Sequence, residues 1–186
     1  MTTSRRALRT LAAVAAVSLL AVACGGAGDP AEDSEPGASA DHEAHSGDTA
    51  ESLAAVFSGA STLEGETFDG GELAQGRVVL WFWAPWCVSC RAEGPRVAEV
   101  AETYSGEVRI VGVPGRGQVE AMNQFVDDTG TGALEHVVDD DGSIWTAFEV
   151  YGQPAFAFLD GSGEIDVFVG TLGSALEERV AALADT

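Results

Sequence analysis

Apolar side chains fill positions 78–83 without interruption, in the run Val-Val-Leu-Trp-Phe-Trp. A block of this length, rich in β-branched and aromatic residues, is typical of a strand that is buried on both faces. The stretch 108–113 has a similar character, and we predict a second buried strand there. At least two of the three aromatic residues in the first block, Trp81, Phe82 and Trp83, are therefore expected to belong to the core.

Further along the chain, the spacing of apolar residues changes from strand-like to helical and back. Helical spacing over 96–104, 119–126 and 174–183 predicts three helices. The segments 155–159 and 165–169 are strand-like and stand on either side of the sequence Asp-Gly-Ser-Gly. This arrangement predicts a β-hairpin.

The order of the predicted elements indicates the fold class. It runs strand, helix, strand, helix, strand, strand, helix, with a turn at 139–142. Helices between the first strands imply parallel crossover connections, and the final hairpin adds an antiparallel edge. We therefore predict one α/β domain over 52–186, with a mixed central sheet flanked by helices on both faces.

The start of the chain has the pattern of an export signal. Three arginines in the first ten positions precede an apolar run over 11–23. That run is shorter than the roughly 20 apolar residues that a membrane-spanning helix needs. The end of the run, Leu-Ala-Val-Ala-Cys over 20–24, resembles the bacterial lipobox, although Ala21 stands where Leu is usual. We therefore predict a lipoprotein signal peptide over 1–23, acylation of Cys24, and a location on the outer face of the cytoplasmic membrane, with secretion after plain cleavage as the alternative.

The segment 24–51 is expected to be an acidic, flexible tether. It consists almost wholly of Gly, Ala, Ser, Asp, Glu and Pro, so it cannot bury enough apolar surface to offset the entropy that ordering costs. His42 and His45 stand in this segment as His-x-x-His. We interpret them as solvated residues of an unstructured run and predict no metal site.

The charge of the chain excludes one class of partner. There are 30 acidic residues and nine basic ones, and the net charge is −21. A chain this acidic repels nucleic acid phosphates and anionic lipid headgroups, so neither is expected to bind to a basic face. The acidity is typical of a soluble exported protein, and steering of basic substrate segments is the functional alternative.

Cys87 and Cys90 form a Cys-x-x-Cys pair where the predicted strand over 78–83 gives way to a helix. The free N–H groups and the dipole at a helix N-terminus stabilise a thiolate, so we expect a lowered pKa for Cys87 and a role as the nucleophile. Cys90, one turn further along, is placed to resolve a mixed disulfide. A zinc site lacks ligands, because the third cysteine is Cys24, and a structural disulfide would close too small a loop to stabilise much. A redox pair is the interpretation that remains.

The residues around this pair resemble a known family. The segment 83–95, Trp-Ala-Pro-Trp-Cys-Val-Ser-Cys-Arg-Ala-Glu-Gly-Pro, is similar to the active-site segment of thioredoxins and, more closely, of the extracytoplasmic DsbE/TlpA-like branch. The segment 151–156 is similar to the cis-proline loop of that family, and 144–158 resembles the mycobacterial secreted DsbE-like proteins. The resemblance covers 57–183 and implies a thioredoxin fold and thiol-disulfide oxidoreductase activity without a cofactor.

The resemblance also implies roles for residues outside the pair. Pro95 matches the proline that kinks the first active-site helix of the family, and Trp86 is expected beside the thiol as an apolar contact for substrate. Gln153 and Pro154 are expected to lie against Cys87 and to receive the substrate peptide, with a cis bond between them. Because proline lacks an N–H, it is tolerated at a strand start and leaves the preceding backbone free to pair with a substrate strand. A proline that only opens an edge strand is the alternative.

Two departures from the family's pattern bear on the direction of electron flow. Trp81 stands where thioredoxin has a buried Asp that accepts the proton of the resolving thiol, which favours an oxidase. Val88 and Ser89 lack the His by which DsbA stabilises its thiolate, which favours a weaker oxidant. Our hypothesis is an oxidase of cysteine-containing exported proteins, reoxidised by a membrane redox partner. The alternative is an extracytoplasmic thiol reductase of the cytochrome c maturation type. A copper metallochaperone would need a Cys-x-x-x-Cys pair with a nearby His, which the sequence lacks.

The prediction for the start of the chain is tested by metabolic labelling with a fatty acid. The wild-type chain should carry the label, and Cys24→Ala should lose it, because the sulfur of Cys24 is the expected site of diacylglycerol attachment. A Cys87→Ser variant is the control and should be labelled like the wild type. Label that persists in Cys24→Ala contradicts the prediction.

Overall fold

The computed structural model describes residues 40–186, with side chains from Gly47 onward. The predicted signal peptide, Cys24 and the first part of the predicted tether lie outside the described residues, as do the side chains of His42 and His45. No helix within the described part of the chain is long and apolar enough to cross a membrane.

A five-stranded mixed sheet forms the centre of the domain, in the order β3-β2-β1-β4-β5. β1 pairs in parallel with β2 and antiparallel with β4, while β2 and β3 are parallel and β4 and β5 are antiparallel. The strands are β1 (Val78–Trp83), β2 (Arg109–Pro114), β3 (Glu135–His136), β4 (Ala155–Leu159) and β5 (Ile165–Val169). This is the predicted mixed sheet, with a short edge strand, β3, that the sequence pattern did not indicate.

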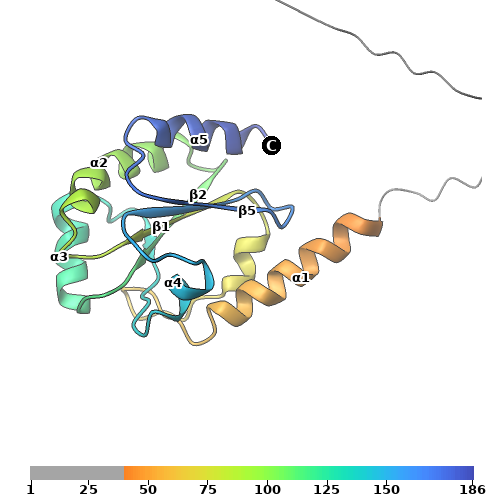
Figure 1. Ribbon diagram of the computed structural model, residues 1–186, viewed down its shortest axis with the longest axis horizontal. Coiled ribbons are helices and arrows are strands. Elements are labelled where there is room, and N and C mark those ends of the chain that lie inside the picture. Colours follow the sequence, from red (N-terminus) through yellow and green to blue (C-terminus); the bar gives the residue numbers. More distant parts are fainter. Residues whose placement is uncertain (1–39) are drawn as a thin grey trace, which may run out of the picture. The chain divides into compact units, whose positions relative to one another are not determined.

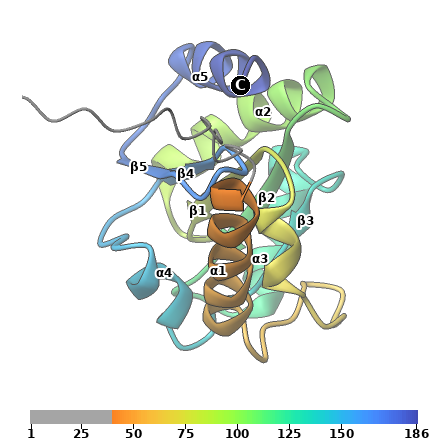
Figure 2. The same cartoon turned by 90° about the vertical axis from the view of Figure 1, so that its right-hand side faces the viewer.

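The two faces of β1 serve two separate cores, because successive side chains of a strand point to opposite faces. All six residues of β1 are buried, which confirms the prediction of a strand covered on both sides. Figures 1 and 2 show helices on either face of the sheet. One core packs under α2 (Val88–Thr103), α3 (Val119–Thr129) and α5 (Ala175–Ala184). The other packs under α1 (Ala40–Val56), the short 3-10 helix η1 (Gly70–Ala74) and α4 (Ser143–Ala147).

The end of the predicted tether is the main difference from the sequence-based expectation. Flexible structure was expected up to residue 51, whereas α1 begins at Ala40, so the prediction is wrong from that residue on. The physical reason is that α1 carries Leu53, and the turn after it Phe57, into the core beneath η1 and α4, with Ala50 packed against the same cluster. Two anchoring side chains are too few to produce a visible helical stripe in an acidic sequence of small residues.

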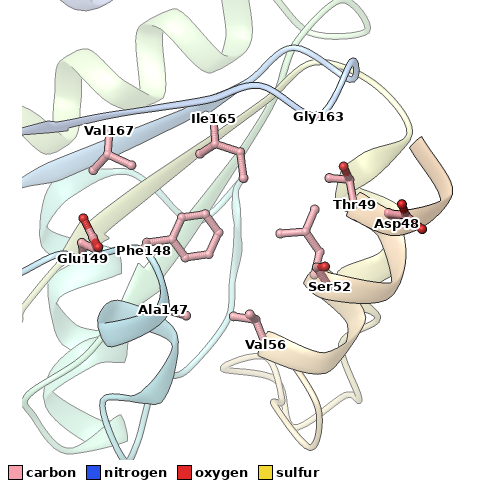
Figure 3. Close-up of a pocket in the computed structure, with 11 residues that line it drawn as sticks. Asp48, Thr49, Ser52, Val56, Ala147, Phe148, Glu149, Gly163, Ile165 and Val167 are labelled. Carbon is pink, nitrogen blue, oxygen red and sulfur yellow. The ribbon is translucent and has the colours of Figure 1, made fainter. Parts of the chain in front are cut away.

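The same helix forms one wall of a groove of about 530 Å³ between α1, α4 and β5. Figure 3 shows Val56 on the helix side of this groove and Phe148 and Ile165 on the opposite side. Neither cysteine of the predicted pair lines it.

A matched pair of substitutions tests whether α1 extends into the predicted tether. Gly47 lies inside α1, is exposed, and has nothing within 4 Å of the position that a Cβ would take. Gly47→Ala should raise the free energy of unfolding by about 0.5–1 kcal/mol, because alanine loses less backbone entropy in a helix. Gly47→Pro should lower it, because proline removes a helical hydrogen bond. Urea unfolding of both variants is the measurement, and two variants as stable as the wild type would indicate a flexible segment.

Candidate functional site

The cysteine pair stands at the junction of β1 and α2. After Trp83 the chain makes one turn, closed by a 3.0 Å hydrogen bond from the Cys87 N–H to the Ala84 carbonyl, and α2 begins at Val88. Cys87 and Cys90 are joined by a disulfide. The N-cap of α2 is Cys87, whose sulfur accepts the N–H of Cys90 at 3.0 Å. The predicted placement of the pair at a helix N-terminus is confirmed.

The two sulfurs differ in exposure. Cys90 is fully buried, whereas Cys87 is 5% exposed. The side chains flanking Cys87 are open to solvent, with Trp86 60% and Val88 83% exposed. The hydroxyl of Ser89 lies 3.6 Å from the Cys87 sulfur. An incoming thiol or disulfide therefore meets Cys87 first, within an apolar rim.

Trp86 is tied to the loop that follows β2. Its indole Nε1–H donates a 2.8 Å hydrogen bond to the carbonyl of Arg116. The Arg116 guanidinium in turn donates through Nη1 to Oε1 of Gln153, at 3.1 Å, and lies 4.5 Å from the ring centroid of Trp145. One arginine thus connects the residue before Cys87 to the residue before Pro154.

Pro154 opens β4 at the same end of the sheet. The Gln153–Pro154 bond is cis, as predicted, and Pro154 is buried. The next residue, Ala155, pairs with Phe82, one position before the end of β1. The register therefore brings the start of β4 beside the turn that carries the cysteine pair.

A buried carboxyl group follows the pair on α2. Glu93, one turn beyond Cys90, is only 3% exposed. Its Oε1 accepts the N–H groups of Leu172 and Gly173 at 2.7 and 2.8 Å, and its Oε2 has no hydrogen-bond partner among the described residues. Burial raises the pKa of Glu93, and the two backbone N–H groups offset part of this effect. Residues three apart on a helix share a face, so the group lies on the side of α2 that also buries Cys90.

The remaining residues predicted from the resemblance have clear positions. Pro95 lies inside α2. Trp81, Phe82 and Trp83 are fully buried, so all three belong to the core. The indole of Trp81 has no hydrogen-bond partner in the described part of the chain. No residue of β1 carries a carboxyl group that could act as the proton acceptor of thioredoxin.

Sequence reasoning overlooked two residues of the site, Arg116 and Glu93. Arg116 stands between two glycines directly after a buried strand, and its backbone has φ 57, a left-handed conformation that arginine rarely adopts. The Gly-Arg-Gly sequence at a strand end was the available signal. Glu93 lay within the motif that carried the resemblance, but nothing in the sequence indicated that the loop after β5 would cover it.

The model of the AhpC/TSA family matches residues 47–168. The soluble secreted antigen MPT53 of Mycobacterium tuberculosis is 40% identical over 129 residues, which cover 67% of this chain and 73% of the antigen.

Two solved structures from Mycobacterium tuberculosis have the same fold. DsbF, solved in mixed oxidised and reduced forms, superposes with a TM-score of 0.66 at 44% identity and covers 70% of this chain and 97% of DsbF. A secreted disulfide oxidoreductase homologous to Escherichia coli DsbE superposes with a TM-score of 0.63 at 37% identity, covering 68% of this chain and 96% of that protein. The match to the family model extends over the whole β1–α2 junction.

The buried carboxyl group makes a prediction about stability. Because burial raises the pKa of Glu93 in the folded chain, the folded state holds this proton more tightly than the unfolded state does. Its contribution is therefore most favourable below the ordinary value of 4.5 and is lost as the pH rises through the raised pKa. Glu93→Gln keeps an acceptor for both N–H groups and carries no charge, so its stability relative to the wild type should increase between pH 4 and pH 8.

Urea unfolding at both pH values measures this change. Glu99→Gln removes an exposed carboxyl group from the same helix and serves as the control, because that carboxylate is ion-paired with Arg96 and carries no burial penalty. A Glu93→Gln variant whose stability difference from the wild type is the same at pH 4 and pH 8 would show that burial does not penalise the charge.

Proposed function

Since the chain belongs to the AhpC/TSA family and is a thiol-disulfide oxidoreductase with a Cys-x-x-Cys disulfide, we propose that it oxidises pairs of thiols in exported proteins. The single observation that supports this direction is the hydrogen bond from the Cys90 N–H to the Cys87 sulfur, at 3.0 Å.

The helix N-terminus favours the reduced protein. A thiolate on Cys87 in the dithiol state would be a stronger acceptor for the Cys90 N–H than a disulfide sulfur is. The first turn of α2 contains no acidic residue that would oppose this negative charge. A disulfide whose reduced form is stabilised is a better oxidant.

The exchange proceeds in two displacements. A substrate thiolate attacks the Cys87 sulfur, which is the more exposed of the two, and Cys90 leaves as a thiolate that takes up a proton. The second substrate thiol, on losing its proton, attacks the substrate sulfur of this mixed disulfide and releases the Cys87 thiolate. The substrate gains a disulfide and loses two electrons, which the cysteine pair now holds as a dithiol.

In this proposal the substrate is held by Trp86, Gln153 and Pro154. Trp86, next to Cys87 in the chain, offers an exposed apolar surface, and Gln153 and Pro154 stand just before β4 at the same end of the sheet. An extended peptide that pairs with the backbone before Pro154 would pass across the Cys87 sulfur. Gln153 and Pro154 therefore act as the peptide-binding residues in this proposal, and Trp86 as its apolar contact.

Glu93 supports a second candidate, an extracytoplasmic thiol reductase. In a reductase, Cys87 attacks the target and the Cys90 thiol must lose its proton before it can resolve the mixed disulfide. Glu93 is a buried carboxyl group on the same face of α2, with a raised pKa and one oxygen that has no partner among the described residues. It would supply the proton acceptor that Trp81 does not.

The proposal includes a location and a partner. The secreted mycobacterial relative and the predicted lipobox at Cys24 favour an extracytoplasmic position, with the lipid anchor as the finer proposal. An oxidase that ends each cycle as a dithiol needs a membrane redox partner that accepts two electrons. A Cys90→Ser variant cannot resolve a mixed disulfide and would retain such a partner covalently on Cys87.

The redox potential of the Cys87/Cys90 couple tests the function and its direction together. For an oxidase we expect a potential closer to about −120 mV than to about −270 mV, because the reduced state is stabilised. Equilibration in glutathione buffers, followed by alkylation of free thiols, gives this value. Cys87→Ser is the control and should show no two-electron couple. A value near −270 mV would reject the oxidase in favour of the reductase, and the absence of any reversible couple would reject both.

A further inference from the structure

One cation at the rim of the site is left without a carboxylate partner. The ion pairs between described residues occupy the side chains of Arg91, Arg96, Arg109 and Arg179. Arg77, at the far end of β1, donates instead to the Thr186 hydroxyl. Arg116 makes no ion pair with a side chain of residues 47–186, although the chain has 30 acidic residues and nine basic ones.

The guanidinium of Arg116 is nevertheless held in place. It lies 4.5 Å from the ring centroid of Trp145, a distance at which a cation is attracted to the face of an indole. Nη1 donates to the Gln153 side chain at 3.1 Å, and the backbone carbonyl accepts the Trp86 indole at 2.8 Å. A planar guanidinium has five N–H donors, so donors remain for a visiting group.

The backbone conformation of Arg116 also indicates a functional role. Arg116 and Glu149 are the two non-glycine residues with positive φ in the described part of the chain. Residues held in sparsely populated backbone conformations concentrate at functional sites, where the surrounding structure maintains them. In this loop, a Cβ at the neighbouring Gly117 would come within 2.4 Å of Pro85, so the loop packs closely against the turn that carries Cys87.

We propose that Arg116 is a specificity-determining residue that binds a carboxylate of the substrate segment next to the reacting cysteine. The inference rests on the proposed thiol-disulfide exchange and adds the chemistry of the preferred substrate. Arg116 contacts Trp86 through its backbone carbonyl and Gln153 through its guanidinium, and both partners are substrate-binding residues in the proposed function. Its remaining donors match the planar, two-oxygen geometry of a carboxylate.

The positive charge of Arg116 matters because the rest of the protein is strongly acidic. With a net charge of −21, the protein repels acidic segments at long range and attracts basic ones. An acidic residue beside the substrate cysteine therefore finds its favourable contact at Arg116. Because Arg116 is exposed, the preference should be modest and should weaken as salt screens the charge.

A comparison of two dithiol peptides tests the proposal. The peptides have the same length and two cysteines, and one carries Asp where the other carries Asn at the positions flanking the first cysteine. The rate constant for reduction of the oxidised full-length chain is measured with each peptide by acid quenching and alkylation. The ratio of the Asp to the Asn rate in the wild type, divided by the same ratio in a variant, cancels the intrinsic reactivity of the peptides.

Arg116→Gln should lower the Asp-to-Asn ratio by about threefold, which is within the range for an exposed ion pair. The substitution keeps the carbonyl that holds Trp86, so the apolar side of the site is retained. Arg116→Lys should keep part of the preference for the Asp peptide, because lysine keeps the positive charge but lacks the planar, two-pronged set of N–H donors. In 1 M KCl the wild-type ratio should approach that of Arg116→Gln.

Arg77→Gln is the matched control, because it removes the same charge from the opposite end of β1 and should leave the ratio as in the wild type. If Arg116→Gln slows both peptides equally, the residue only positions Gln153 and the proposal is overturned. If Arg77→Gln lowers the ratio as much, net charge rather than Arg116 is responsible. Exchange with the Asn peptide reports on the proposed function separately, since that function fails only when neither peptide reacts.

Discussion

The hydrogen bond between the Cys90 N–H and the Cys87 sulfur depends on where β1 ends and α2 begins. Because β1 is buried on both faces, its end is fixed by two cores, and one turn of chain then places a sulfur at the N-terminus of a helix. The same arrangement buries Cys90 completely and leaves Cys87 5% exposed. The two cysteines thus differ in exposure and in hydrogen-bond partners because the sheet fixes where β1 ends.

The sequence predicted the parts of the fold whose patterns are continuous. The strand over 78–83 and the hairpin over 155–169 were found at their observed bounds, since buried strands and tight turns leave strong local signals. The helix α1 and the two-residue β3 were not found. Both are stabilised by contacts with distant segments rather than by local pattern, and α1 begins in a stretch whose composition alone is typical of a flexible linker.

The candidate site likewise has a part that the sequence predicted and a part that it did not. The cysteine pair, Trp86 and the cis-proline loop lie in motifs that can be read along the chain. The contacts that join them cross long intervals, 30 residues from Trp86 to Arg116 and 37 from Arg116 to Gln153. Glu93 becomes a buried acid only because a loop 79 residues later covers it. These relationships belong to the folded chain, so periodicity and spacing could not indicate them.

The loop that carries Arg116 has a consequence for how such a protein can diverge. A side chain at Gly117 would collide with Pro85, and the positive φ at position 116 disfavours β-branched residues there. Within these limits, long unbranched or amide side chains fit at position 116 without altering the turn that holds the disulfide. A single substitution at position 116 could therefore change which substrates the enzyme prefers, while the disulfide exchange at the cysteine pair is retained.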